Sequence, residues 1–313
     1  MHTPPNTSRL EADAAGIQFH YDLPVGFFQL FLDPTMSYTC HYFLRRTETL
    51  EQAAQNKLAL IAKKLQLRPE DRVLDIGCGW GNFLLYGAKE FGCHVTGITL
   101  SPSQAQYIAT KAAAEGLSDL VRVDVVHADA MPYPSASFTK IVTIGTIEHI
   151  DDLSGLFRSC NRLLVDDATA FMLVHGMTCP VDGGASQQPE GALDEEAHFI
   201  RDYIFPVGDF TNEFEVVRAL ETSGFELIDL ENIPDHYTLT LRHWLNNLEK
   251  HCADLGAETG VRPERFRAQL LFLAGFIEGF RENRILCYQN LVRKIRTGQK
   301  RTPLPLTRER LLP

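Results

Sequence analysis

The stretch RVLDIGCGWG, residues 72–81, decides the fold of this chain. Its first half is an apolar run that predicts a buried strand, and it leads directly into a turn with glycine at positions 77, 79 and 81. Glycine permits positive φ and lets a ligand approach the backbone without meeting a Cβ atom. Residues 82–91 follow with the apolar spacing of a helix. The stretch therefore predicts a nucleotide-like ligand at the carboxyl end of a parallel sheet, against a helix N-terminus.

The carboxylate of Asp75 strengthens this prediction. The glycine spacing differs from that of a dinucleotide-binding turn, and a glycine-rich turn without any ligand is the alternative. Core packing, however, gives no reason for an acidic residue just before the turn. The pattern D-x-G-x-G resembles the first motif of S-adenosylmethionine (SAM) methyltransferases, in which the turn packs against the nucleoside and methionine portions. The resemblance implies that Asp75, Gly77, Gly79 and Gly81 bind SAM.

Composition excludes several classes of protein. A chain of 313 residues can bury a large core, which predicts one α/β domain with a helical addition. The net charge of −10 argues against non-specific nucleic-acid binding. The seven cysteines form no C-x-x-C pair, which favours a reducing cytoplasm over a disulfide framework or a metal site. We expect a cytoplasmic protein, because we find neither a bilayer-spanning apolar run nor a signal peptide.

The end of the chain has the opposite charge. From Arg293 it reads RKIRTGQKRTPLPLTRERLLP, basic and then proline-rich. Two interpretations are open: a solvated end, or a weak peripheral contact with lipid headgroups or an acidic partner, to which each basic residue contributes ~1 kcal/mol. The sequence also leaves open whether the chain forms a homodimer.

Strands and helices alternate from Arg72 onward. This alternation predicts a Rossmann-like, doubly wound and mostly parallel sheet, with the ligand site across the strand C-termini. Further strands are expected at 94–100, 121–129, 138–147, 169–177, 225–233 and 285–292, with helices at 102–114, 153–163 and 213–223. The chain then divides into a flexible N-terminus (1–19), a helical cover (20–68), a SAM-binding core (69–178), a largely helical substrate lid with returning sheet elements (179–283), and an edge strand with the basic tail (284–313).

Polar residues after the second and third strands are candidates for cofactor binding. SAM-binding enzymes often hold the ribose with an acidic residue after the second strand, but here Thr99 and Gln104 are available instead. Ser101 followed by proline is also an ordinary helix start. Asp129 and Ala130 come where the adenine would be recognised, and a solvated loop carboxylate is the alternative.

Four separate pieces of the chain carry ionisable or nucleophilic groups. Glu148 closes the fourth strand, where packing does not explain a carboxylate, and His149 follows it. His175, Tyr237 and Cys40 each have an ordinary structural explanation, as a hydrogen-bonded core histidine, a packing aromatic residue and a small hydrophobe. Because strand ends at one sheet edge meet, we expect these groups to converge on one pocket.

Five segments in order resemble the cyclopropane fatty acid synthases and mycolic acid cyclopropane synthases: residues 21–43, 73–104, 144–150, 173–177 and 234–244. The resemblance implies SAM-dependent methyl transfer to an alkene carbon, with no metal. It also implies a bicarbonate ion near the reacting centre, held by Cys40 (backbone N–H), Glu148, His175, Met177 (backbone N–H) and Tyr237. The SAM contacts it implies are Tyr38, Thr39, Gly77, Gly79, Thr99, Leu100, Gln104 and Ile144.

Two features point to other substrates. Residues 178–196 lack periodicity and, with RDYIFPVGDF after them, look more like the coclaurine N-methyltransferase branch, which acts on amines. No tryptophan follows the third strand, as it often does in members with lipid substrates. Tyr237 favours C-methylation of a lipid-like or isoprenoid-like alkene, since it completes the anion site. A non-catalytic protein that binds SAM or lipid is a third hypothesis.

Overall fold

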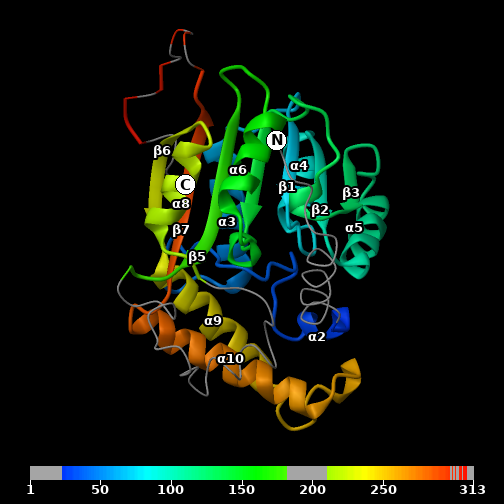
Figure 1. The fold of residues 1–313 in the computed structure, drawn as a ribbon. Helices are drawn as coiled ribbons and strands as arrows, with labels where there is room; N and C mark the ends of the chain where they lie inside the picture. Colours follow the sequence, from blue (N-terminus) through cyan, green and yellow to red (C-terminus); the bar gives the residue numbers. More distant parts are fainter. Residues whose placement is uncertain are drawn as a thin grey trace.

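The computed structural model describes residues 23–181, 210–296, 298, 300, 303–304 and 306–308. These residues form a seven-stranded sheet in the order β3-β2-β1-β4-β5-β7-β6 (Figure 1). Five strands are parallel: β1 (Arg72–Ile76), β2 (His94–Thr99), β3 (Val121–Val125), β4 (Lys140–Ile144) and β5 (Phe171–Thr178). The strand order reverses between β1 and β4, which is where sheets of this kind bind ligands. The predicted Rossmann-like sheet is confirmed.

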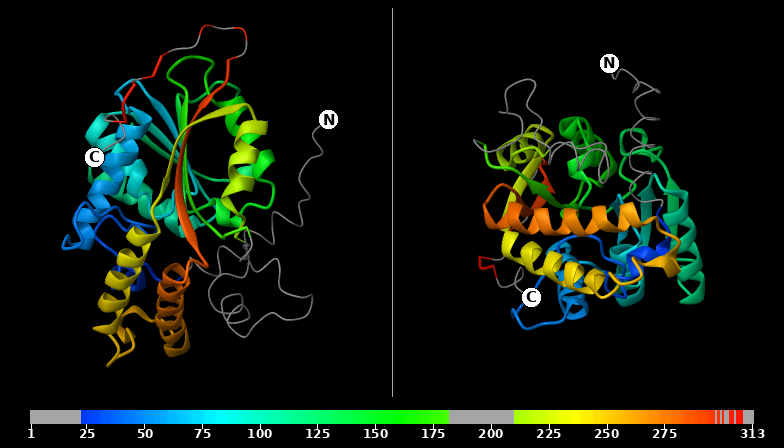
Figure 2. Two further views of the ribbon diagram at one scale, coloured as in Figure 1. Left: turned by 90° about the vertical axis from the view of Figure 1, so that its left-hand side faces the viewer. Right: turned by 90° about the horizontal axis from the view of Figure 1, so that it is seen from below.

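Helices cover both faces of the sheet (Figure 2). Buried side chains of α3 (Leu50–Leu65), α4 (Asn82–Phe91) and α5 (Pro102–Ala114) pack on one face, and those of α6 (Leu153–Leu163) and α8 (Glu213–Thr222) pack on the other. N-cap side chains determine where two of these helices begin. Ser101 accepts a hydrogen bond from Gln104 N at the start of α5, and Asp152 accepts one from Gly155 N in α6. The bounds predicted for α4, α5 and α6 are confirmed.

A helical cover lies across the carboxyl ends of the parallel strands (Figures 1 and 2). It consists of α2 (Val25–Gln29), the irregular segment 33–43, α9 (Pro234–Glu249) and α10 (Pro263–Arg281). Their aromatic side chains form one buried cluster, which also takes in Trp80 from the glycine turn. Phe28 lies 5.4 Å from Trp80, and Tyr38 lies 5.2 Å from Trp244, between ring centroids. Such pairs add roughly 0.5–1.5 kcal/mol each to simple burial.

The placement predicted for the last strand is wrong. Strand β7 (Leu286–Lys294) is not at the edge of the sheet, because it pairs antiparallel with both β5 and β6 (Phe225–Asn232), and β6 forms the edge. Within the described part of the predicted cover, residues 23–68, regular helix is confined to α2 and α3, and 33–43 forms none. The third and fourth strands are shorter than expected, because 3-10 turns at η1 (Ala128–Ala130) and η2 (Ile147–His149) follow them.

Part of the basic tail is engaged with the sheet. Arg293 Nε lies 2.7 Å from Glu226 Oε2, and Arg308 pairs with Asp229 on β6. Among the residues that the structure describes, none of the helices is both long and apolar enough to cross a membrane. The peripheral lipid contact and the homodimer therefore stay predictions.

Candidate active site

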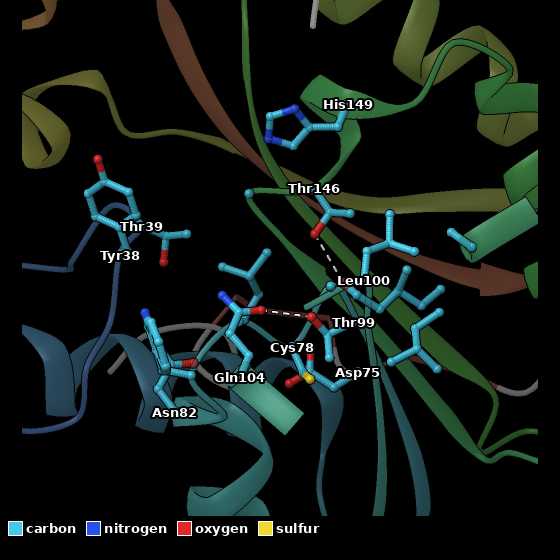
Figure 3. Close-up of a pocket in the computed structure, with 18 of the residues that line it drawn as sticks. Tyr38, Thr39, Asp75, Cys78, Asn82, Thr99, Leu100, Gln104, Thr146 and His149 are labelled. Atoms are coloured by element: carbon cyan, nitrogen blue, oxygen red, sulfur yellow. Dashed lines mark hydrogen bonds between the residues drawn. The ribbon is translucent and has the colours of Figure 1, made fainter. Parts of the chain in front are cut away.

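A pocket opens at the carboxyl ends of β1, β2 and β4, under residues 36–39 of the cover (Figure 3). Its empty volume, counted to the open mouth, is about 960 Å³, in the range of small-molecule sites. Nine of the predicted cofactor residues line it: Tyr38, Thr39, Asp75, Gly77, Gly79, Thr99, Leu100, Gln104 and Ile144. Lining residues that the sequence analysis did not select include Met36, Cys78, Trp80, Asn82, His127, Thr146 and His149.

The three glycines of the turn have different roles. All three have positive φ: +71° at Gly77, +52° at Gly79 and +82° at Gly81. A Cβ atom at Gly77 would lie 2.2 Å from Thr146 Oγ1, whereas one at Gly79 would meet nothing within 4 Å. Gly79 therefore leaves open space for a ligand. Gly81 does not line the pocket; it caps α4, and a Cβ atom there would lie 2.7 Å from Ile108.

This difference predicts unequal costs for two alanine substitutions. Gly79→Ala should lower the free energy of unfolding by about 1 kcal/mol, because only the positive φ is strained. Gly77→Ala should cost about 1–3 kcal/mol more, because the new methyl group also displaces Thr146. Denaturant unfolding of the cofactor-free protein measures both. Equal losses would show that Thr146 moves aside freely.

Thr99 and Gln104 act as a pair. Thr99 Oγ1 donates to Gln104 Oε1 over 2.7 Å (Figure 3). The Gln104 Nε2 group is then the end of the side chain that can donate to a ligand. This geometry fits the predicted replacement of the acidic ribose ligand.

Asp129 and Ala130 do not line the pocket; Val126, His127 and Ala128 do. The reason is the tight turn η1, where Asp129 N donates to His127 Nδ1 over 3.1 Å. The lining residues of this loop therefore lie earlier in the chain than Asp129 and Ala130, the residues that the sequence analysis selected.

Lys57 is a buried cation behind the pocket that the sequence analysis missed. Its Nζ donates to Thr39 Oγ1 over 2.9 Å and to Ser37 Oγ. Burial lowers the pKa of Lys57 to about 8, and burial raises the pKa of Asp75 to about 7, against the attraction of Lys57. The helical spacing of the sequence could have identified it, because Lys57 and Lys64 are seven residues apart and both lie on the apolar face of α3.

The second group of predicted residues forms a buried cluster beside the pocket, here called the Glu148 cluster. Its members are Cys40, Glu148, His175, Met177, Tyr237 and the unpredicted Cys287. Glu148 Oε1 accepts from Met177 N over 2.7 Å, while the buried Oε2 atom has no hydrogen-bond partner among the described residues. Burial raises the pKa of Glu148 to about 7. His149, next in sequence, lines the pocket instead.

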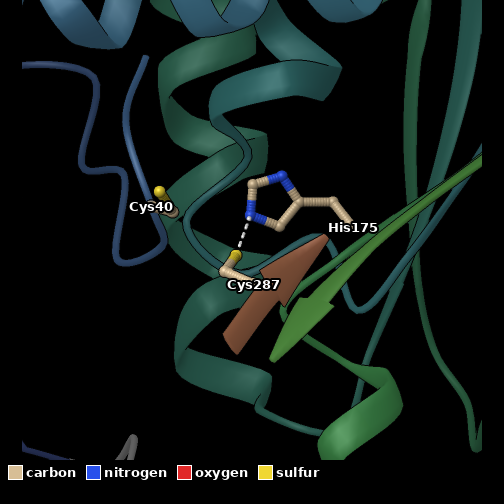
Figure 4. Close-up of side chains that lie close together, drawn as sticks. All are labelled: Cys40, His175 and Cys287. Carbon is tan, nitrogen blue, oxygen red and sulfur yellow. Dashed lines mark hydrogen bonds between the residues drawn. The ribbon is translucent and has the colours of Figure 1, made fainter. Parts of the chain in front are cut away.

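Within this cluster, side chains from the cover and two strands meet (Figure 4). One polar atom each of Cys40, His175 and Cys287 lies within 4.8 Å of the others, and His175 Nε2 is 3.5 Å from Cys287 Sγ. The Tyr237 ring packs at a tilt of 38° against Phe280, with 4.8 Å between ring centroids. The pKa of its phenol is raised first by burial and then by the neighbouring Cys287, Cys40 and Glu148. The structure therefore brings Cys40, Glu148, His175, Met177 and Tyr237 together, but none of them lines the pocket, so their predicted convergence on that pocket stays a prediction.

The chain is similar to known proteins in sequence and in fold. The chain is 35% identical over 301 residues to the "Probable fatty acid methyltransferase" of Pseudomonas putida, covering 95% of this chain and 73% of that protein. It is 31% identical over 295 residues to the "Sphingolipid C9-methyltransferase" of Candida albicans, covering 90% of this chain but only 55% of that protein. The crystal structure of mycolic acid cyclopropane synthase CmaA1 complexed with SAH and CTAB superposes with a TM-score of 0.80 at 30% identity, covering 90% of this chain and 98% of that one.

The fold and the pocket define a SAM-dependent methyltransferase. The family model described as mycolic acid cyclopropane synthetase matches residues 8–290. The chain belongs to that family, as the order of its five segments predicted.

Proposed function

We propose that this protein transfers a methyl group from SAM to an alkene carbon of a lipid-like or isoprenoid-like chain, giving a cyclopropane or a methylated product. The observation that carries the proposal is the Glu148 cluster, with a buried carboxylate oxygen that has no hydrogen-bond partner in the described part of the chain. The names of the relatives support a lipid substrate, since they act on fatty acids or sphingolipids and the CmaA1 structure holds the detergent CTAB.

The pocket residues fit SAM. Open space at Gly79, the buried carboxyl group of Asp75 and the Nε2 donor of Gln104 would hold the nucleoside and methionine portions. When bound, SAM supplies an electrophilic sulfonium methyl group. An alkene is a weak nucleophile, so the chain must align the two reactants at close range and exclude water. The aromatic cover does this, because Tyr38 and Trp80 line the pocket and pack into the buried aromatic cluster.

Methyl transfer to an alkene leaves a carbocation on the substrate. Faces of aromatic rings stabilise cations at roughly 0.5–2 kcal/mol each. Tyr38 and Trp80 line the pocket, and Tyr237 belongs to the neighbouring Glu148 cluster. The cation must then lose a proton: loss from the new methyl group closes a ring, and loss from a neighbouring carbon leaves a methylated or methylene product. The chain therefore needs a weak base that water cannot replace.

The Glu148 cluster fits bicarbonate as that base. Glu148 Oε2 is a buried acceptor with no hydrogen-bond partner among the residues that the structure describes, as a bicarbonate hydroxyl would require. Lys57 and Lys64 both lower the pKa of His175 by their positive charge, after the larger effect of burial, so the local field favours an anion. We propose that Glu148, His175, Tyr237 and the backbone N–H groups of Cys40 and Met177 hold it. When bound, bicarbonate supplies the proton acceptor.

The first test is a turnover assay with labelled SAM. Incubation with unsaturated lipids and isoprenoids should give a product heavier by one CH2 unit. Methylation of amines alone would overturn the proposal. SAM binding by calorimetry without turnover on any of these substrates would instead favour the non-catalytic hypothesis.

A variant separates C-methylation from N-methylation. Tyr237→Phe should lower alkene methylation at least about tenfold, because it removes a hydrogen bond to a charged group. Tyr288→Phe is the matched control. Tyr288 pairs with Gly176, so its side chain lies on the face of the sheet opposite to that of His175. Full activity in Tyr237→Phe would favour an amine substrate, which leaves no carbocation. The residues that suggested that substrate, 178–196, lie mostly outside the described residues.

A further inference from the structure

Three strands place a row of polar side chains on the sheet face that α3 covers. In the register of the sheet, His175 of β5 lies opposite Gln289 of β7, and Gln289 lies opposite Glu231 of β6. Residues opposite one another across strands project to the same face. Lys64 of α3 reaches this row from above, and Lys64, Gln289 and His175 are each at most 1% exposed.

The chemistry of the side chains determines which group donates and which accepts in each hydrogen bond of this row. Lys64 Nζ lies 2.8 Å from Gln289 Oε1 and 2.5 Å from Glu231 Oε2. An ammonium group donates and cannot accept, so the Gln289 atom facing Lys64 is the carbonyl oxygen. The amide nitrogen Gln289 Nε2 then faces His175 Nδ1, at 3.1 Å. Since an amide NH2 group only donates, His175 Nδ1 must be the acceptor.

The state of the imidazole ring follows. With Nδ1 as acceptor, the ring carries its one proton on Nε2. Burial, reinforced by the charges of Lys57, Lys64 and His41, lowers the pKa of His175 to about 3, so the ring is neutral at ordinary pH. The Nε2–H group points toward Cys287 Sγ and Cys40 Sγ, inside the Glu148 cluster (Figure 4).

We propose that Gln289, oriented by Lys64, is a positioning residue that locks His175 as an N–H donor, and that this donor serves the oxyanion of the Glu148 cluster. The inference rests on the proposed function in one respect, the identity of that anion as bicarbonate.

The same hydrogen bonds disfavour a metal ion at this cluster. Two thiols and an imidazole within 4.8 Å of one another have the composition of a zinc site. Metal binding needs a lone pair on the ring nitrogen, and here that nitrogen carries the proton. The nearby charges of Lys57 and Lys64 oppose a cation further.

The test uses the full chain with SAH bound and 15N-labelled histidine. In the wild type, the NMR shifts of His175 should show a neutral ring protonated on Nε2, with His175→Gln used for assignment. Gln289→Glu replaces the amide by an acceptor-only carboxylate, so the ring proton should move to Nδ1. A wild-type ring protonated on Nδ1, or an unchanged tautomer in Gln289→Glu, would overturn the proposal.

Binding is measured without turnover. Titration of 13C-bicarbonate should show affinity at least roughly tenfold weaker for Gln289→Glu than for wild type, because a donor to a charged group is lost. Zn²⁺ should gain affinity in the same variant. Unchanged bicarbonate affinity would overturn the role of the donor. Lys64→Met should also weaken bicarbonate binding. Lys63→Met, on the exposed side of α3, is its control and should leave that affinity unchanged.

These readouts separate the two proposals. Failure to methylate alkenes would refute the proposed function, while the tautomer and the bicarbonate affinity would still decide the role of Gln289. Conversely, alkene methylation with a His175 ring protonated on Nδ1 would leave the function standing and refute the role of Gln289.

Discussion

Replacing Glu148 by glutamine should lower turnover on the order of 10²-fold or more, with SAM affinity little changed. The glutamine Oε1 atom can still accept from Met177 N, so the local fold is retained. The second position, however, changes from an acceptor that no described residue contacts by a hydrogen bond to an NH2 donor, and the cluster loses the atom that would accept from the anion. Single-turnover rates and calorimetric SAM binding measure the two quantities separately.

The pH profile supplies the control for this prediction. Burial raises the pKa of Glu148 to about 7, so turnover at saturating SAM should rise with pH through about 7, as the carboxylate ionises. Glu148→Gln should abolish that rise. Glu213→Gln is the matched variant, because burial also raises the pKa of Glu213 to about 7 and Glu213 lies on α8, away from the pocket lining. Equal losses of SAM binding and rate in Glu148→Gln would show that Glu148 holds the cofactor instead.

Replacing Lys57 by methionine should weaken SAM binding at least about tenfold and destabilise the fold by on the order of 3 kcal/mol. Lys57 donates to Thr39 Oγ1, a lining atom of the pocket, and its charge lowers the pKa of Asp75 against the larger effect of burial. Without Lys57, segment 33–43 loses its anchor and Asp75 holds its proton to higher pH. Calorimetry and denaturant unfolding measure the two losses.

Lys57 also gives stability a distinctive pH dependence. Its pKa is about 8 in the folded protein against 10.5 for an ordinary lysine, so the unfolded chain binds more protons between these values. The contribution of Lys57 to stability should therefore increase as pH rises from about 8 to about 10.5. Lys57→Met should remove this increase, and Lys63→Met, on the exposed side of the same helix, should keep it. A variant as stable and as tight for SAM as wild type would contradict the anchoring role.

Local signals predicted the parts of the fold that local forces determine. The glycine turn, the proline after Ser101 and the apolar spacing of residues 153–163 each act within one or two helical turns, and the elements begin and end accordingly. The order of β6 and β7 depends on pairing between segments about 60 residues apart, for which the sequence carries no local mark.

The candidate site was predictable to a similar extent. Glu148 and His175 were identified because they are ionisable residues at the ends of apolar strands, where core packing does not require a polar side chain. Gln289 and Cys287 were missed because they lie inside an ordinary strand, and only its register against β5 brings them to His175. Asp129 was misplaced because the 3-10 turn η1 carries it past the pocket.

The aromatic cluster has an optical consequence. The chain contains two tryptophans, Trp80 in the glycine turn and Trp244 in α9, and both are buried in that one cluster. Intrinsic fluorescence of the unlabelled protein therefore comes from the junction between the cofactor turn and the helices above it. The emission spectrum should therefore report ligand binding in the pocket directly, without any attached dye, because Trp80 lines that pocket.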